Sequence, residues 1–189
     1  MKNTLAEAGV FLLELVKVVV LSLAIIIPIR YYVVQPFYVS GQSMEPTFLN
    51  HEYLLIDELT YRFDSPQRGD VIVFHYPRDP SKYFIKRLIG LPGETVIITN
   101  GQVTIQNQSS PEGFILEELY LQGATTMGDY SVKVSPDTYF LLGDNRNESL
   151  DSRIFGPVPV KNIVGRVWLR AFPLNRWTVF NGSVFVMAN

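Results

Sequence analysis

Apolar residues of this chain form one long run near its start and short alternating runs after it. Residues 10–29 read VFLLELVKVVVLSLAIIIPI, and as a helix these residues reach about 30 Å, the thickness of a bilayer core. Glu14 and Lys17 interrupt the run three residues apart, so they can face each other on a helix. Both lie nearer the N-terminal end of the run, from which long side chains can reach the membrane interface. A basic residue and two tyrosines follow at residues 30–32, as at a membrane–water boundary. We therefore predict a transmembrane anchor at about residues 10–29, within an N-terminal segment 1–32.

Two other interpretations of this run stay open. One is a cleaved signal peptide, although residues 28–32 lack the small side chains of a cleavage site. The other is a helix buried in a protein core.

The pattern after the anchor predicts strands. Residues 70–76 form a β-branched and aromatic run between Gly69 and Pro77, and residues 163–172 form another. Residues 96–99 and 102–106 flank Asn100-Gly101, the pair that favours a two-residue hairpin turn. No long amphipathic helix period is present. The fold class is therefore mainly β, with an N-terminal transmembrane helix followed by a β-rich catalytic domain.

Residues 107–136 differ in composition, being richer in Ser, Gly, Glu and Thr. We interpret them as a small inserted subdomain or excursion, in which residues 116–120 form a short helix or strand. The catalytic core then consists of residues 33–106 and residues 137–189.

Composition excludes several kinds of chemistry. The net charge of −2 gives no general attraction to nucleic acid, and we expect no nucleic-acid partner. The absence of cysteine excludes disulfides, thiol catalysis and cysteine-based zinc sites, and with only two histidines we expect no metal and no cofactor.

Ser43 and Lys86 are the residues that could carry catalysis. A serine hydroxyl is a poor nucleophile unless a base takes its proton, and lysine is that base only when neutral. A pKa about 3 units below the ordinary lysine value would suffice, and desolvation shifts it in that direction. The apolar residues on both sides of Lys86 suit such a shift. Taken singly, Lys86 is a surface residue at a strand end and Ser43 a turn or helix-cap residue.

Four ordered segments together resemble bacterial type I signal peptidases (leader peptidases), membrane serine proteases with a serine–lysine dyad. The segments are residues 40–47 (SGQSMEPT), 68–74 (RGDVIVF), 86–94 (KRLIGLPGE) and 143–153 (GDNRNESLDSR). The resemblance covers most of the chain, apart from residues 107–136 and roughly the last dozen.

This resemblance implies a role for each matching residue. Ser43 attacks the scissile carbonyl, Lys86 is the general base, and the Ser43 backbone N–H holds the oxyanion. Ser149 orients the lysine. Supporting ion pairs are implied between Arg87 and Asp144 and between the neighbouring positions Asp151 and Arg153. Some members carry a serine two positions before the nucleophile as a second oxyanion donor, but this chain has Gly41 there, as other members do.

The family selects small side chains at the first and third positions before the cut. By motif position, we expect Val39, Met44, Phe84 and Ile85 to line the substrate pockets; otherwise they are core residues. Tyr31, Tyr32, Phe37 and Tyr38 follow the anchor closely and are expected near the lipid surface, although Phe37 and Tyr38 also suit a buried first strand.

Three rival functions remain. A Ser-His-Asp hydrolase would use His51 or His75, neither of which has a recognisable orienting context. A self-cleaving repressor with the same dyad would need an N-terminal DNA-binding module. A membrane-anchored, non-catalytic peptide-binding β module would have no use for a desolvated lysine.

The sequence thus predicts a membrane-anchored serine endopeptidase that cleaves N-terminal signal peptides from exported preproteins. Its expected partners are those signal peptides and the lipid bilayer. It is expected in the plasma or inner membrane as a single-pass protein, with the catalytic domain on the outer side. The orientation rests on the resemblance, and the oligomeric state is not predicted.

Overall fold

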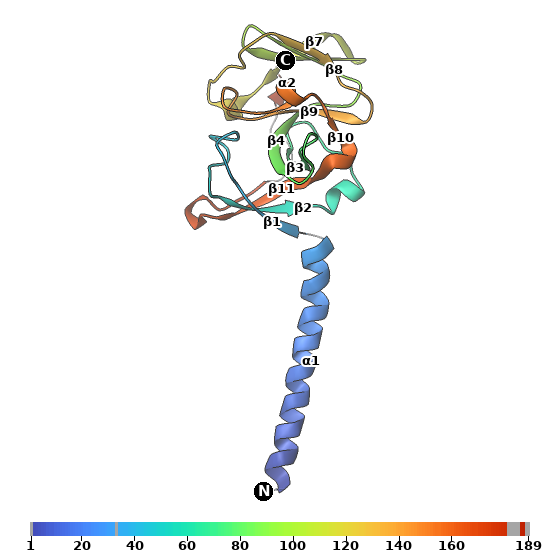
Figure 1. The fold of residues 1–189 in the computed structure, drawn as a ribbon, viewed down its shortest axis with the longest axis vertical. Coiled ribbons are helices and arrows are strands. Elements are labelled where there is room, and N and C mark those ends of the chain that lie inside the picture. Colours follow the sequence, from blue (N-terminus) through green and yellow to red (C-terminus); the bar gives the residue numbers. More distant parts are fainter. Residues whose placement is uncertain (1, 33, 181–185, 188–189) are drawn as a thin grey trace.

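A long N-terminal helix extends from a β-rich body in the computed structural model, which describes residues 2–32, 34–180 and 186–187 (Figure 1). Helix α1 (Lys2–Tyr32) contains an apolar stretch at Gly9–Ile27 with a mean hydropathy of 2.8, none of it buried in the chain. The length of the stretch suits a bilayer, and the predicted apolar helix is confirmed.

The larger sheet is antiparallel in every strand pair and carries the two longest segments predicted as strands. Strands β3 (Val71–His75) and β11 (Ile163–Phe172) coincide with the runs predicted at residues 70–76 and 163–172, which are therefore confirmed. Its order is β1 (Val34–Tyr38), β2 (Tyr53–Asp57), β11 (Ile163–Phe172), β3 (Val71–His75), β4 (Tyr83–Gly90), β9 (Thr138–Leu142) and β10 (Val158–Pro159), with β12 (Thr178–Val179) paired to β11.

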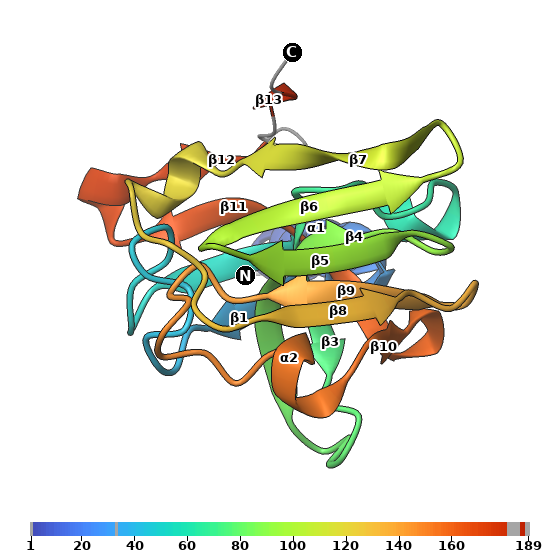
Figure 2. The same ribbon diagram turned by 90° about the horizontal axis from the view of Figure 1, so that it is seen from above.

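A second sheet lies at the end of the body away from α1 (Figures 1 and 2). Its order is β13 (Val186–Met187), β7 (Ser110–Glu117), β6 (Gln102–Asn107), β5 (Thr95–Thr99) and β8 (Tyr130–Lys133). Asn100 and Gly101 have φ angles of 51° and 80°, as the predicted hairpin turn requires. The expected boundary at residue 107 falls on the last residue of β6, which pairs with β7, so β5 and β6 lie in the same sheet as the strands after the boundary.

Short helical turns connect the strands. They are η1 (Thr60–Arg62), η2 (Leu119–Leu121), α2 (Ser152–Phe155), η3 (Val160–Asn162) and η4 (Leu174–Arg176). The segment expected as a short helix or strand at residues 116–120 contains both, because β7 ends at Glu117 and η2 begins at Leu119.

Strand β4 joins the two sheets and thereby fixes the position of Lys86. Its Ile89 packs in a cluster with Val96 and Phe140, whereas the neighbouring Leu88 packs in a separate cluster with β3. A Cβ on Gly90 would lie 2.5 Å from a Val96 methyl carbon, so only glycine allows this close approach. The lysine is therefore carried on a strand packed on both sides.

Candidate active site

A tight turn between β1 and β2 carries Ser43. The backbone N–H of Glu45 donates to the Gln42 carbonyl at 3.1 Å, and that of Phe48 donates to the Met44 carbonyl at 2.8 Å. Met44 and Phe48 are buried in a core cluster, so the turn is anchored by the residues that follow the serine. Such anchoring holds the Ser43 hydroxyl in one place.

Lys86 meets this serine from β4. Its Nζ lies 2.7 Å from Ser43 Oγ and donates to the Ile85 carbonyl at 2.8 Å. The residue is only 3% exposed. Desolvation lowers the pKa of Lys86 from the ordinary 10.5 to about 8, although the negative charges of Asp151 and Asp144 oppose the shift. The sequence alone could not give this distance, which joins residues 43 positions apart.

Ser149 is buried close to the nucleophile turn but makes no hydrogen bond with the described residues through its Oγ. A Cβ added to Gly143 would lie 2.1 Å from Ser149 Oγ and 2.5 Å from the Ser43 carbonyl oxygen, so both groups surround this glycine. The orienting role of Ser149 toward Lys86 is therefore not expressed as a hydrogen bond here, and it stays a prediction.

Both expected ion pairs are present. Arg87 donates to both oxygens of Asp144, at 2.8 Å from Nε and 2.6 Å from Nη2. Arg153 likewise donates to both oxygens of Asp151, at 2.9 and 2.8 Å. Asp151 also accepts from the backbone N–H of Gly143 at 3.1 Å, and all four charged side chains are largely buried. Fork-shaped pairs of this kind fix geometry, which suits a scaffold around the dyad.

An apolar cleft of about 500 Å³ opens beside the dyad. Three of the four expected pocket residues, Val39, Phe84 and Ile85, line it. Met44 does not, because its side chain points into the core and is only 1% exposed. The lining also includes residues that the sequence did not suggest, namely Phe37, Tyr38, Leu54, Val73, Lys82, Tyr83, Glu148 and Leu150.

Two asparagines hold the nucleophile turn and were missed by sequence reasoning. The Asn145 backbone N–H donates to the Ser43 carbonyl at 3.0 Å. Asn50 Oδ1 accepts from the Gly41 N–H at 3.0 Å. Asn145 lies inside a matched motif and could have been suspected, whereas nothing in the sequence marks Asn50.

The two histidines lie in other surroundings. His75 pairs through Nδ1 with the Pro80 carbonyl at 2.7 Å, and its ring packs on Tyr83. His51 forms hydrogen bonds with Tyr38 and Asn50. No hydrogen bond joins either histidine to Ser43 in the described part of the chain, so the geometry favours the lysine as its base.

Known proteins resemble this chain over most of its length. A sequence model of the family described as "Signal peptidase, peptidase S26" matches residues 12–172. The signal peptidase I of Leptolyngbya laminosa is 41% identical over 172 residues, which cover 87% of this chain and 82% of the relative. The probable signal peptidase I-1 of Synechocystis sp. is 36% identical over 185 residues, with coverages of 94% and 91%. A crystal structure of a signal peptidase I from Enterococcus faecalis is 35% identical with a TM-score of 0.47, covering 55% of this chain and 97% of that one.

A serine hydroxyl held against a buried lysine, in a chain with these relatives, defines a serine endopeptidase. The chain belongs to the signal peptidase family, peptidase S26. Its N-terminal apolar helix is consistent with membrane anchoring.

Proposed function

We propose that this protein removes N-terminal signal peptides from exported preproteins, with Ser43 as nucleophile and Lys86 as general base. The observation that carries the proposal is the 2.7 Å contact between Lys86 Nζ and Ser43 Oγ, made by a lysine whose burial brings its pKa to about 8. At pH 7 about one molecule in ten then holds a neutral amine, against about one in 3,000 at the ordinary lysine pKa.

In the neutral state the Ser43 hydroxyl donates its proton to the Lys86 lone pair as Oγ attacks the scissile carbonyl carbon. The tetrahedral intermediate collapses when the ammonium of Lys86 protonates the leaving amine, which releases the mature protein. Lys86, neutral again, then takes a proton from water, and the resulting hydroxide attacks the acyl-enzyme ester. A second collapse returns the proton to Ser43 Oγ and frees the signal peptide.

The developing oxyanion would be held by the Ser43 backbone N–H, which forms no hydrogen bond with other described residues. The Gly41 N–H donates to Asn50 and is therefore not free to act as the second donor. Ser149 is the candidate to hold the Lys86 amine once the Ser43 proton has been transferred, because its buried Oγ has no other partner among the described residues.

The substrate would bind as an extended strand in the apolar cleft, with small side chains facing Val39, Phe84 and Ile85. The cleft opens along β1 and the start of β4, whose unpaired edges can accept such a strand. Family membership and the names of the relatives support signal peptides as the substrate.

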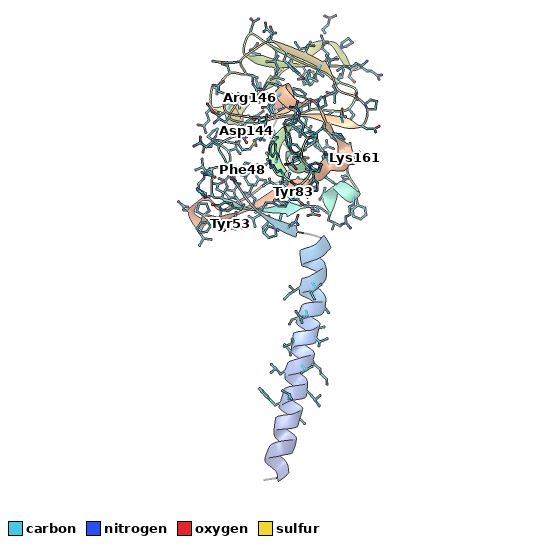
Figure 3. The ribbon with its side chains drawn as sticks, viewed as in Figure 1. Phe48, Tyr53, Tyr83, Asp144, Arg146 and Lys161 are labelled. Carbon is cyan, nitrogen blue, oxygen red and sulfur yellow. The ribbon has the colours of Figure 1, made fainter. Side chains whose placement is uncertain are left out.

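The lipid bilayer is the second partner we propose. Strands β1, β2 and β11 lie at the end of the body from which α1 extends, where Figure 3 labels Tyr53, and they and the η4 turn with the residue after it carry exposed apolar side chains. This apolar patch consists of the aromatic residues Tyr38, Tyr53, Trp168, Phe172 and Trp177 together with Leu174. Aromatic rings favour the membrane–water interface. Leu174→Asp with Trp177→Asp should reduce cleavage of a membrane-inserted preprotein and leave cleavage of a short peptide in detergent unchanged; equal losses on both substrates would contradict the patch's role.

We further propose that the N terminus is cytoplasmic and the β-rich body lies on the outer side of the membrane, with α1 as the single span. The chain contains no cysteine, so Ser109→Cys creates a single labelling site on the body. A membrane-impermeant maleimide should label it in spheroplasts. Labelling only after lysis would indicate the opposite orientation, with the β-rich body in the cytoplasm.

Cleavage of a preprotein with alanine at the first and third positions before the cut tests the proposed chemistry. The full chain in detergent should cleave it, as should His75→Ala, whereas Ser43→Ala and Lys86→Ala should not. Loss of activity with His75→Ala but not with Lys86→Ala would make histidine the base. A wild-type chain that binds the preprotein without cutting it would be a peptide-binding module.

A further inference from the structure

Arg146 lies in the loop that follows β9, and its guanidinium is buried against the connection between β7 and β8. It donates to both oxygens of Glu118, at 2.8 Å from Nη1 and 2.5 Å from Nη2. It also donates to the Thr126 hydroxyl and, at 3.1 Å, to the Tyr120 hydroxyl. The Arg146 side chain is 1% exposed and that of Glu118 is 8% exposed. One guanidinium thus meets three side chains from residues 118–126.

The same segment covers the second arginine of the site. The ring of Tyr120 lies under the guanidinium of Arg87, with Cζ 3.9 Å from the ring centroid. The Tyr120 hydroxyl donates to Glu118 at 2.5 Å. The ring that stacks on Arg87 and the Glu118 carboxylate that pairs with Arg146 are therefore directly connected. We call residues 118–126 the clamp segment.

On their other sides both arginines hold the loop that carries Asp144 and Ser149. Arg146 Nε donates to the Gly143 carbonyl at 3.1 Å, and Arg87 is paired with Asp144. Asp144 and Arg146 are labelled in Figure 3, where they lie on the same side of the β-rich body. The same loop binds the nucleophile turn through the Asn145 N–H. The clamp segment is therefore linked by two buried arginines to the loop that holds the Ser43 turn in place.

Neutralising Glu118 would leave the Arg146 cation buried without its counter-charge. The other carboxylate whose charge acts on Arg146 is Asp144, which is already paired with Arg87. A buried cation without a partner competes for such carboxylates. Asp144 is also one of the two carboxylates whose charge raises the pKa of Lys86. Loss of Glu118 should consequently disturb both the loop and the titration of the base.

We propose that the clamp segment is a positioning device for peptide cleavage and that Glu118 is its positioning residue, acting through Arg146 on the loop of residues 143–149. This inference rests on the proposed function, because the reaction concerned is the proposed peptide cleavage. It assigns to the connection between β7 and β8 a role that the sequence did not indicate. Glu118 touches neither the cleft nor the dyad.

The test compares Glu118→Gln with Glu117→Gln in the full chain. Glu117 is the exposed neighbour, so its substitution changes the net charge equally without reaching Arg146. For Glu118→Gln we expect kcat on a preprotein to fall at least tenfold, with KM within twofold of wild type. The midpoint of the pH–kcat profile should move to lower pH. The unpaired Arg146 cation and the reduced attraction between Asp144 and Lys86 both disfavour the lysine ammonium. Glu118→Asp should recover part of the kcat.

A loss of kcat that merely follows the folded fraction, with the pH midpoint unchanged, would overturn the proposal, as would wild-type kinetics in Glu118→Gln. If Glu118→Gln does not fold, Tyr120→Phe removes only the hydroxyl between Glu118 and Arg146, and it should lower kcat in the same way but less. Acetylation of Lys86 by acetic anhydride across pH, followed by mass spectrometry, measures the titration of Lys86 without any cleavage. If the wild type does not cleave preproteins, the proposed function is wrong. A shift of the acetylation midpoint of Lys86 in Glu118→Gln would in that case still support the clamp segment as a positioning device.

Discussion

Replacing Lys86 by methionine should abolish catalysis and yet remove a cost to stability, because the folded chain holds this amine away from water. Burial lowers the pKa of Lys86 from the ordinary 10.5 to about 8. Between these two pH values the unfolded chain binds a proton that the folded chain has released, so the free energy of unfolding of the wild type rises with pH in this window. Below pH 8 both states are protonated and the full cost of the buried ammonium is present.

That cost is about 3 kcal/mol at pH 7, since each pKa unit corresponds to about 1.4 kcal/mol. Lys86→Met removes it but also loses the contacts of Nζ with Ser43 and the Ile85 carbonyl, each a hydrogen bond of about 1 kcal/mol. We therefore expect Lys86→Met to be more stable than wild type by about 1 kcal/mol at pH 7. The difference between the two proteins should decrease by about 3 kcal/mol as the pH rises from 7 to 10.5.

Guanidinium unfolding of the full chain in detergent, followed by tryptophan fluorescence, measures this difference. Both tryptophans of the chain lie in the β-rich body, so the signal does not come from α1. Lys82→Met is the matched control, because the ammonium of Lys82 is largely exposed. A stability difference for Lys86→Met that is independent of pH, or the same pH dependence in Lys82→Met, would show that burial of the Lys86 ammonium carries no such cost.

Two further substitutions test the packing around the nucleophile turn. Gly143→Ala places a Cβ within 2.5 Å of the Ser43 carbonyl oxygen and nearer still to Ser149 Oγ, so the nucleophile turn must move. We expect kcat to fall at least about 100-fold. A crystal structure of the variant with an unmoved turn would contradict this. Asn50→Ala removes the acceptor of the Gly41 N–H. It should lower the free energy of unfolding by about 1 kcal/mol, measured by guanidinium titration, and reduce kcat by up to tenfold. Unchanged stability and kcat would show that this hydrogen bond does not hold the nucleophile turn.

The local features of the fold were within reach of the sequence. An apolar run of bilayer length predicts α1 by itself, and Asn100-Gly101 predicts its hairpin because both residues adopt positive φ. The strand of residues 163–172 is identified by its β-branched and aromatic composition. Each of these depends on neighbours in the chain, which is why a single sequence suffices.

The features that depend on distant contacts were harder to predict. Motif position made Met44 a pocket residue, but the turn directs its side chain into the core. The pairing of β6 with β7 depends on the register between the two strands, which the change of composition at residue 107 does not specify. The inserted subdomain at residues 107–136 stays a prediction. The contacts of Glu118 with Arg146 join residues 28 positions apart, and no periodicity specifies such a pair.

Activation of Ser43 by a neutral Lys86 can be followed through the dependence of kcat/KM on pH. Cleavage of a preprotein by the wild type should rise about tenfold per pH unit below pH 8 and level off above it, because the rate follows the neutral fraction of a base with a pKa of about 8. The double variant His51→Gln, His75→Gln should give the same profile. A midpoint near pH 6.5 that disappears in the histidine variant would instead make a histidine the base.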